Sequence, residues 1–294
     1  MCAKVAVAMS GGVDSSTAAW ILKQAGHDLI GVTMKLFDNG DVGVEGESTC
    51  CSLDDVEDAR AVARQLGFPF YVFNFSRQFH HQVMDRFACA YERGETPNPC
   101  IDCNRYLKFG ALLQRAKELD RDYVATGHYV RLSYDRGSGR WLLHKALHPE
   151  KDQSYVLYNL TQDQLSHSLF PLGGLSKDEI RAMAAQQGLI NAKKHESQDI
   201  CFVPDGDYAA FIRRHTGKTY PHGPFLDQEG HVLGEHTGIV GYTVGQRRGL
   251  GVSSNRGRLY VKQVRPEDNA VVLSDNAALF STALTACDIN WIPF

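Results

Sequence analysis

The segment Ser10-Gly11-Gly12-Val13-Asp14-Ser15-Ser16 decides the fold of this chain, because it joins two runs of different periodicity. Residues 5–9 before it are apolar, as in a buried parallel strand, and residues 17–23 after it are alanine-rich, as in a helix. Two glycines let the backbone turn tightly beside a ligand, and the free N–H groups at the start of a helix attract an anion. The segment therefore predicts a phosphate cradle between a strand and a helix.

The chemistry of this segment differs from that of a Walker P-loop, since the Gly-Lys-Ser/Thr ending is absent. Backbone N–H groups and hydroxyls remain to hold a pyrophosphate, and Asp14 is placed to hold a magnesium ion. The pattern resembles the SGGxDS loop of ATP pyrophosphatases, which adenylate a substrate. The alternative is an ordinary glycine turn with a Ser or Asp helix cap.

The composition is that of a globular protein. The 294 residues are 43% hydrophobic, so the chain can bury a large core and is long enough for two domains. No apolar run approaches the length of a membrane span, and the N-terminus lacks a signal-like stretch, so we expect a cytoplasmic protein without a membrane segment. The formal net charge of −3 gives no overall basic field. Any nucleic-acid surface is therefore expected to be a local patch.

Strand-like and helix-like runs alternate through the first half of the chain. They cover residues 5–9, 17–24, 29–36, 54–66, 70–75, 77–91, 105–119 and 123–130. This alternation predicts an α/β fold with a doubly wound parallel sheet and helices on both faces. Ligands bind beyond the carboxyl ends of such strands. One site would then gather the residues at those ends, which are Ser10, Met34, Asn74 and Gly127-His128.

The second half of the chain differs in composition and in predicted secondary structure. From Asp205 onward it contains repeated glycines, turn pairs and short β-prone runs such as residues 238–244 and 259–264. We therefore expect a catalytic domain over residues 1–204 and a small β-rich domain over residues 205–283. Residues 284–294 begin another strand-like run, at which the chain ends.

Two cysteines lie three residues apart in Thr96-Pro97-Asn98-Pro99-Cys100-Ile101-Asp102-Cys103-Asn104. The prolines disfavour helix before them, so Cys103 is expected near the start of the following helix, where the pKa of a thiol is lowered. Cys201 stands in a polar, motif-like setting, residues 196–202. A CxxC pair alone serves redox, zinc and iron–sulfur sites. A zinc site would need His195 as a fourth ligand, and its spacing does not fit.

Three thiols together with an ATP-type loop favour sulfur transfer. ATP would turn a carbonyl oxygen into an AMP leaving group, and a persulfide sulfur would attack that carbon or be released to it as sulfide. A second cysteine would resolve the persulfide as a disulfide bond. The adjacent Cys50 and Cys51 would make a strained disulfide, so we expect these thiols to be incidental.

Separate motifs make the chain resemble, almost end to end, the bacterial tRNA-specific 2-thiouridylases, which thiolate the wobble uridine of certain tRNAs. The resemblance implies an adenine nucleotide alpha hydrolase-like fold, adenylation of the uridine C2 oxygen by ATP, and sulfur transfer from a cysteine persulfide. The motifs are residues 9–16, 31–34, 96–99 with 103–104, 125–129, 151–155, 197–202 and 245–251.

The resemblance also implies roles for single residues. Cys103 would be the nucleophile and Cys201 the persulfide carrier. The target base would lie against Asn98, Pro99 and Cys100. The ATP site would comprise Ala8, Met9, Ser10, Gly11, Gly12, Val13, Asp14, Ser15, Met34 and Gly127.

The implied partners are a tRNA with a wobble uridine, of the Glu, Gln or Lys type, and a sulfur donor, either a relay protein or a cysteine desulfurase. Lys151, Asp152 and Gln153 would contact the tRNA, and His128 would approach the anticodon or the nucleotide. Glycines flank Arg247-Arg248, so this pair is expected to form an exposed cationic loop suited to phosphate contact.

The chain departs from the family pattern at two places. Some members carry Asp where this chain has Cys100, and members with CxxC are candidates for a 4Fe–4S cluster, which Cys100, Cys103 and Cys201 would hold. Members also continue into a C-terminal β-barrel domain, of which residues 284–294 would be an incomplete start. The alternative functions are an iron–sulfur or redox module that binds nucleotide and tRNA, and another ATP pyrophosphatase ligase.

Overall fold

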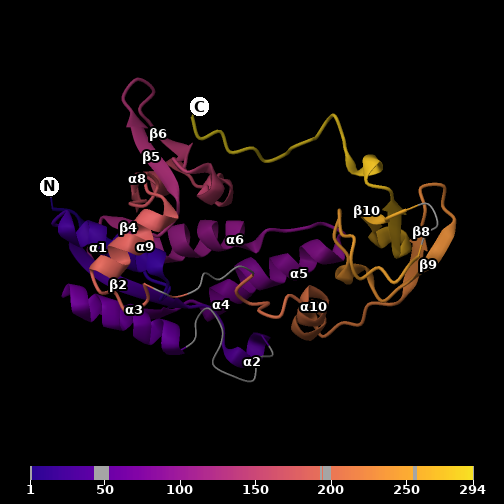
Figure 1. The fold of residues 1–294 in the computed structure, drawn as a ribbon, viewed down its shortest axis with the longest axis horizontal. Coiled ribbons are helices and arrows are strands. Elements are labelled where there is room, and N and C mark those ends of the chain that lie inside the picture. The colour runs from indigo at the N-terminus through magenta and orange to yellow at the C-terminus, as the bar shows by residue number, and fades with distance from the viewer. Residues whose placement is uncertain (1, 43–52, 193, 195–199, 254–256, 294) are drawn as a thin grey trace. The chain divides into compact units, whose positions relative to one another are not determined.

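The computed structural model of the chain describes residues 2–42, 53–192, 194, 200–253 and 257–293. The chain divides into two compact units (Figure 1). The first comprises Met1–Gln82, Cys100–Phe202 and Ile289–Phe294, and the second comprises Val83–Pro99 and Val203–Asp288. Both units are therefore discontinuous in sequence, and the contiguous domain boundaries given above stay a prediction.

The first unit is built on a five-stranded sheet in the order β3-β2-β1-β4-β7, in which every pair is parallel. The centres of β1 and β2 are buried and apolar, as expected for strands covered on both faces. The predicted doubly wound parallel sheet is thereby confirmed. The strands are β1 (Lys4–Ala8), β2 (Asp28–Lys35), β3 (Phe70–Asn74), β4 (Tyr123–Ala125) and β7 (Ser168–Leu169).

The strand order reverses at β1, because β2 and β3 lie on one side of it while β4 and β7 lie on the other. The carboxyl ends of β1 and β4 are therefore neighbours at a topological switch point, where open α/β sheets bind ligands. Residues 10–16, called the phosphate loop below, leave β1 at this point. Thr126-Gly127-His128 leaves β4 beside it.

Helix α1 (Val13–Gln24) begins within the phosphate loop, so residues 13–16 of the loop form its first turn. Gly12 is its N-cap, Asp14 stands in its first turn and Lys23 in its last, which complements the helix dipole. It packs against α3 (Leu53–Leu66) and α9 (Lys177–Gln186) over the buried side chains of β1.

Further short helices and a β-hairpin complete the first unit. A hairpin and a capped helix follow β4, and a π-helical segment lies between two α-helices in the region of the CxxC motif. These elements are α2 (Asn39–Val42), α4 (Ser76–Phe79), α6 (Pro99–Asp102), the π-helical segment Cys103–Ala111, α7 (Leu112–Glu118), β5 (Val130–Asp135), β6 (Arg140–Lys145) and α8 (Gln162–Ser166).

Residues 289–293 form hydrogen bonds with other parts of the first unit. Asn290 Nδ2 donates to the carbonyl oxygens of Tyr158 and Leu160, each at 2.9 Å. Arg140 Nε donates to the carbonyl oxygen of Ile292 at 2.9 Å. That residues 284–294 start a barrel domain stays a prediction.

The second unit contains a four-stranded sheet in the order β10-β11-β8-β9, in which only β11 and β8 are parallel. Phe87 of α5 (Asp85–Glu92) packs against Phe211 of α10 (Tyr208–Thr216), with ring centroids 6.0 Å apart. The predicted small β-rich part is confirmed. Its strands are β8 (Gly223–Leu226), β9 (Val232–His236), β10 (Tyr260–Arg265) and β11 (Ala270–Ser274).

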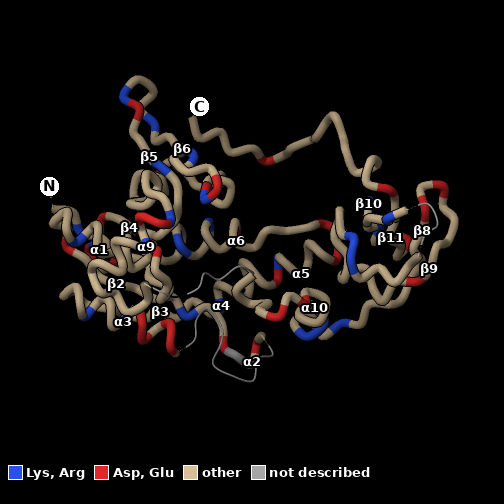
Figure 2. Tube along the Cα trace, viewed as in Figure 1, with Lys and Arg blue, Asp and Glu red and all other residues tan. Residues whose placement is uncertain are grey.

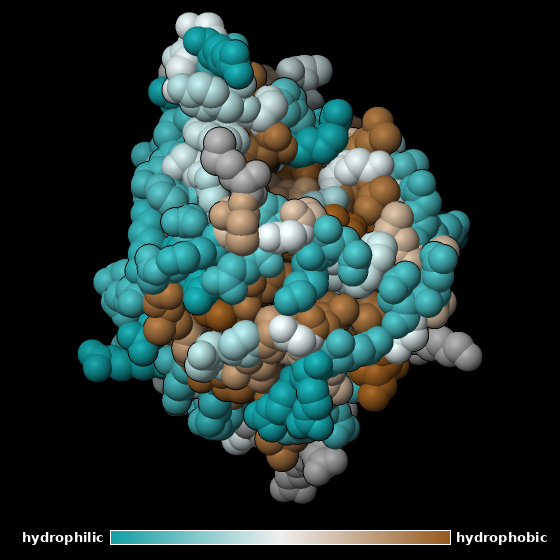
Figure 3. All heavy atoms as spheres, turned by 90° about the vertical axis from the view of Figure 1, so that its left-hand side faces the viewer, coloured by the Kyte–Doolittle hydropathy of each residue, from teal (hydrophilic) through white to brown (hydrophobic). Residues whose placement is uncertain are grey.

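Lys and Arg are interspersed with Asp and Glu along the chain (Figure 2). On the face that Figure 3 shows, hydrophobic patches are broken by hydrophilic side chains. Among the helices formed by the described residues, none has the length and apolar character that crossing a membrane requires.

Candidate functional site at the switch point of the sheet

Hydrogen bonds within the phosphate loop fix its turn. The Ser10 N–H donates to Ser15 Oγ at 3.2 Å, and the Ser15 hydroxyl donates to the carbonyl oxygen of Gly12 at 3.1 Å. These two bonds use the Ser15 side chain and the Gly12 carbonyl oxygen. The first-turn N–H groups of α1 stay available to an anion.

Two glycines allow close backbone approaches at this loop. Gly11 has a φ of +75°, and a Cβ there would lie 2.4 Å from the carbonyl oxygen of Asp55. A Cβ on Gly127 would lie 2.9 Å from Asp14 C and from Ser15 N. The structure thus brings Gly127 against the phosphate loop at the switch point, as the sequence predicted from the strand ends.

The other residues predicted to bind ATP lie on the elements around the loop. Ala8 ends β1, Met34 is the next-to-last residue of β2, and Val13 begins α1. The Met9 N–H donates to the carbonyl oxygen of Val32 at 2.8 Å. Their contact with the nucleotide stays a prediction.

Asp14 lies in a cluster that the sequence did not predict. Its Oδ1 accepts hydrogen bonds from the Lys177 ammonium and the Tyr129 hydroxyl, each at 2.7 Å. Lys177 is only 8% exposed and begins α9. The absence of a lysine from the phosphate loop was the available signal that a cation would come from elsewhere in the chain.

Asp14 keeps one oxygen that a magnesium ion could use, since Oδ2 receives no hydrogen bond from any residue that the structure describes. Magnesium is commonly bound by one or two carboxylates together with substrate phosphates. The donor set therefore fits a magnesium ion that arrives with ATP.

Asn191 is a second residue that the sequence analysis missed. Its Nδ2 donates to the carbonyl oxygen of Gly11 at 2.8 Å and to Ser16 Oγ at 2.7 Å. Asn191 is 3% exposed, so these bonds form in a dry environment. They hold the phosphate loop against the segment that leads toward Cys201.

The expectation for Cys103 was wrong in one respect. The helix begins at Pro99, because proline is favoured in the first turn, and Cys103 therefore lies a turn further on, in the π-helical segment. Cys103 is buried, and burial raises the pKa of its thiol, an effect that the positive charge of Lys108 only partly offsets. Burial thus disfavours the thiolate form of Cys103 in this structure.

The three candidate thiols differ in access. Cys100 is exposed, Cys201 is partly exposed, and Cys103 is buried. Among the described residues, the set of three His, Cys, Asp or Glu ligand atoms within 4.8 Å of one another is at Asp227, outside this site. The thiols therefore do not form a preassembled ligand set for an iron–sulfur cluster here.

A hydrogen-bonded path joins the thiol helix to the phosphate loop. Asn104 Nδ2 donates to the carbonyl oxygen of Val156 at 3.1 Å, and the Val156 N–H donates to the carbonyl oxygen of Gln153. Gln153 Oε1 accepts the Tyr129 N–H at 2.9 Å, and the Tyr129 hydroxyl bonds Asp14. The path connects the residue after Cys103 with the first turn of α1.

The predicted tRNA-contacting turn Lys151-Asp152-Gln153 is therefore also part of the scaffold. Asp152 accepts hydrogen bonds from the Ala146 N–H at 2.8 Å and the Ser154 hydroxyl at 2.7 Å. Burial alone would raise the pKa of Asp152, but these hydrogen bonds outweigh it and lower the pKa below its usual value. Contact of this turn with tRNA stays a prediction.

His128 is a buried core residue in this structure. Its Nδ1 shares a 2.7 Å hydrogen bond with Thr126 Oγ1, and its ring lies near those of Phe109 and Phe170. Burial first, and the positive charge of Lys108 second, hold the pKa of His128 well below its usual value. Its contact with tRNA or nucleotide stays a prediction, and such contact would require the ring to be uncovered.

The other predicted RNA-contacting residues belong to the second unit. Asn98, Arg247 and Arg248 are exposed, whereas Pro99 is buried. The Gln246 side chain donates to the carbonyl oxygen of Arg248 at 3.0 Å and holds the predicted cationic loop in a turn. His195, residues 197–199 and the Cys50-Cys51 pair lie outside the described residues.

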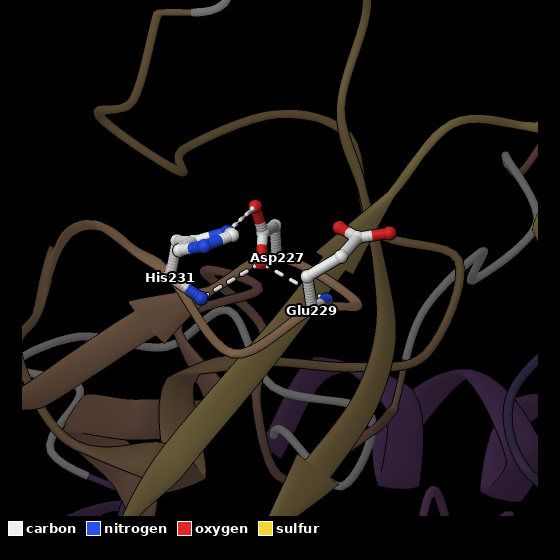
Figure 4. Close-up of side chains that lie close together, drawn as sticks. All are labelled: Asp227, Glu229 and His231. Carbon is white, nitrogen blue, oxygen red and sulfur yellow. Dashed lines mark hydrogen bonds and ion pairs between the residues drawn. The ribbon is translucent and has the colours of Figure 1, made fainter.

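Asp227, Glu229 and His231 form an acidic and histidine cluster between β8 and β9 (Figure 4). The Asp227 carboxylate accepts hydrogen bonds from the Glu229 and His231 N–H groups at 3.0 and 2.8 Å. Asp227 Oδ2 lies 3.0 Å from His231 Nδ1. This carboxylate thus stabilises its own turn, and we assign it no metal.

Two family models match most of this chain. A tRNA methyl transferase HUP domain model matches residues 3–205, and a tRNA methyl transferase PRC-barrel domain model matches residues 209–275. A solved 4-thiouridine synthetase in complex with RNA and ATP is 18% identical, with a TM-score of 0.42 over 69% of this chain and 45% of that one.

Curated relatives are much more similar. The tRNA-specific 2-thiouridylase MnmA of Clostridioides difficile is 50% identical over 98% of this chain and 80% of its own length. That of Clostridium acetobutylicum is 48% identical over 99% of this chain and 81% of its own length. This chain therefore belongs to the tRNA-specific 2-thiouridylase family.

Proposed function

We propose that this chain uses ATP to replace the C2 oxygen of a tRNA wobble uridine by sulfur, which forms 2-thiouridine. Its membership of the 2-thiouridylase family supports this function. The observation that carries the proposal is the hydrogen-bonded path from Asn104 to Asp14. Adenylation and sulfur delivery must reach one carbon, and the path gives the phosphate loop and the thiol helix a shared rigid support.

In the first step the uridine C2 oxygen attacks the α-phosphorus of ATP. A bond forms between this oxygen and phosphorus, and the bond from phosphorus to pyrophosphate breaks. The N–H groups at the start of α1 would bind the departing pyrophosphate. A magnesium ion, which Asp14 would hold, would neutralise phosphate charge when bound. The base must leave its stack, because a stacked base cannot present this oxygen to ATP.

In the second step the terminal sulfur of a Cys201 persulfide attacks the activated carbon, and AMP leaves with the former C2 oxygen. The Cys103 thiolate then attacks Sγ of Cys201, which breaks the S–S bond and leaves the outer sulfur on the base. A Cys103–Cys201 disulfide forms, and an external thiol must reduce it before the next turnover. In the alternative order, Cys103 attacks Sγ of Cys201 first and releases the outer sulfur as sulfide. The sulfide then attacks the activated carbon, and AMP leaves.

Asn98, Pro99 and Cys100 would contact the target base, while Lys151 and the pair Arg247-Arg248 would contact phosphates. The substrate would be a cytoplasmic tRNA of the Glu, Gln or Lys type. A relay protein or a cysteine desulfurase would supply the sulfur.

An anaerobic turnover assay tests this function. The full chain is incubated with Mg–ATP, a persulfide-charged cysteine desulfurase and unmodified tRNA, and digested nucleosides are identified by mass spectrometry. We expect 2-thiouridine with the wild-type protein and with Cys89→Ser, which changes an exposed cysteine outside the site. We expect none with Cys201→Ser or Cys103→Ser.

Three results would contradict the proposal. They are wild-type activity in Cys201→Ser, a methylated instead of a thiolated uridine, and a failure of the wild-type protein to consume ATP with tRNA. An absorbance near 400 nm in the anaerobically purified protein would favour the iron–sulfur alternative.

A further inference from the structure

Lys177 is a buried lysine whose position is fixed by the helix that it begins. The preceding residue, Ser176, caps α9 by accepting the Glu179 N–H, while the Glu179 carboxylate accepts the Ser176 N–H at 2.7 Å. This capping box fixes the backbone at the first residue of the helix. The Lys177 side chain is 9% exposed, so packing against neighbouring residues restricts its conformation.

The Lys177 ammonium lies at the first turn of α1. It donates to Asp14 Oδ1 at 2.7 Å and lies 5.9 Å from the centre of the Tyr129 ring. Asp14 is the second residue of α1, so the ammonium lies beside the first turn of that helix, whose free N–H groups would meet a phosphate.

A purely structural role explains this arrangement poorly. Burying the Lys177 ammonium costs solvation that its attraction to Asp14, whose side chain is 30% exposed, often only just repays, and an apolar side chain of similar size would stabilise the fold as well. The Asp14 carboxylate also places a negative charge at the predicted phosphate site. A cation is therefore needed there when a nucleotide adds its own negative charges.

We propose that Lys177 is the phosphate-binding cation of this site and replaces the lysine that the phosphate loop lacks. Without nucleotide it neutralises Asp14. When Mg–ATP binds, the carboxylate holds the magnesium ion, and the ammonium donates to a phosphate oxygen. This inference rests on the proposed use of ATP.

The test is isothermal titration of the full chain with ATP, in magnesium and separately in EDTA. In EDTA the ammonium would be the main cation at the site, so we expect Lys177→Met to bind ATP roughly 10–100-fold more weakly than wild type, as for a lost charge-assisted hydrogen bond. Lys177→Arg keeps the charge and should retain most of the affinity. Lys23→Met, in the last turn of the same helix, is the matched control and should bind like wild type.

A second readout uses the metal alone. Removal of the ammonium leaves Asp14 without its cation, so Mn2+ added without nucleotide should bind more tightly to Lys177→Met than to wild type, measured by electron paramagnetic resonance. Should the Met variant fail to fold, Lys177→Gln keeps a donor to Asp14 without the charge and serves in both measurements.

The outcomes separate this inference from the proposed function. If the wild-type protein binds ATP and Lys177→Met or Lys177→Gln binds it with equal affinity, the role of Lys177 is overturned while the proposed use of ATP stands. Wild-type protein that binds no ATP in either condition would overturn both. A weakened Lys23→Met would show that the loss is not specific to this site and would also overturn the role of Lys177.

Discussion

Adjacent glycines of the phosphate loop are expected to respond very differently to the same substitution. At Gly11 the backbone has a φ of +75°, and a Cβ would lie 2.4 Å from the carbonyl oxygen of Asp55 and 2.8 Å from its Cα. At Gly12 the φ is −86°, and the nearest atom to a Cβ would be Ser10 Oγ at 3.5 Å. The backbone of α3 therefore blocks a side chain at Gly11 and not at Gly12.

The size of the effect follows from these contacts. A left-handed backbone costs an L-residue about 1–2 kcal/mol, and forcing an extra methyl group into a packed site costs about 1–3 kcal/mol. We therefore expect Gly11→Ala to lower the free energy of unfolding of the first unit by about 2–5 kcal/mol. Gly12→Ala should cost less than about 1 kcal/mol, the difference between glycine and alanine as a helix cap.

Urea denaturation followed by tryptophan fluorescence measures this difference. All three tryptophans, Trp20, Trp141 and Trp291, belong to the first unit, so the signal reports the unit that contains the phosphate loop. The midpoint should fall for Gly11→Ala while the slope with urea stays unchanged. Equal destabilisation by the two substitutions would refute the close approach of α3 to the phosphate loop.

Two further predictions follow from buried titratable groups. Since the fold holds the pKa of His128 well below its usual value, the unfolded chain takes up a proton first as the pH falls, and the free energy of unfolding should drop below about pH 6.5 by up to about 1.4 kcal/mol per pH unit. His128→Phe should lack this component in urea titrations, and identical pH slopes in the two proteins would contradict it. Because burial raises the pKa of Cys103, iodoacetamide at neutral pH should alkylate Cys103 at least about tenfold more slowly than the exposed Cys100, as peptide mass spectrometry would show. Faster modification of Cys103 would mean that its burial is not maintained in solution.

The sequence carried enough local information to predict the sheet and the position of the site. Strand periodicity and the double glycine are properties of short segments, and the switch point follows from the order of the strands. The sequence predicts for this reason that Gly127 lies near Ser10 and the phosphate loop, since both follow strands of one parallel sheet, and the structure places Gly127 against that loop. Short-range patterns therefore predict where the ligand site lies.

Contacts between distant segments could not be predicted in the same way. Lys177 and Asn191 meet the phosphate loop from 163 and 180 residues away, and neither stands in a motif that marks it. The sequence predicts Cys103 near the start of a helix. In the structure the helix starts earlier, at Pro99, so Cys103 lies in its second turn and is buried. Long-range packing decides which partners Lys177 and Asn191 have and how far Cys103 is buried.

The most direct test of the account compares the amounts of AMP and 2-thiouridine formed in one reaction with Mg–ATP, persulfide donor and tRNA. If the phosphate loop and the thiols serve a single reaction, wild-type protein forms the two products in equal amounts, and Cys201→Ser releases AMP only when tRNA is present and forms no 2-thiouridine. Formation of 2-thiouridine without AMP would contradict the central claim that ATP activates the carbon to which sulfur is transferred.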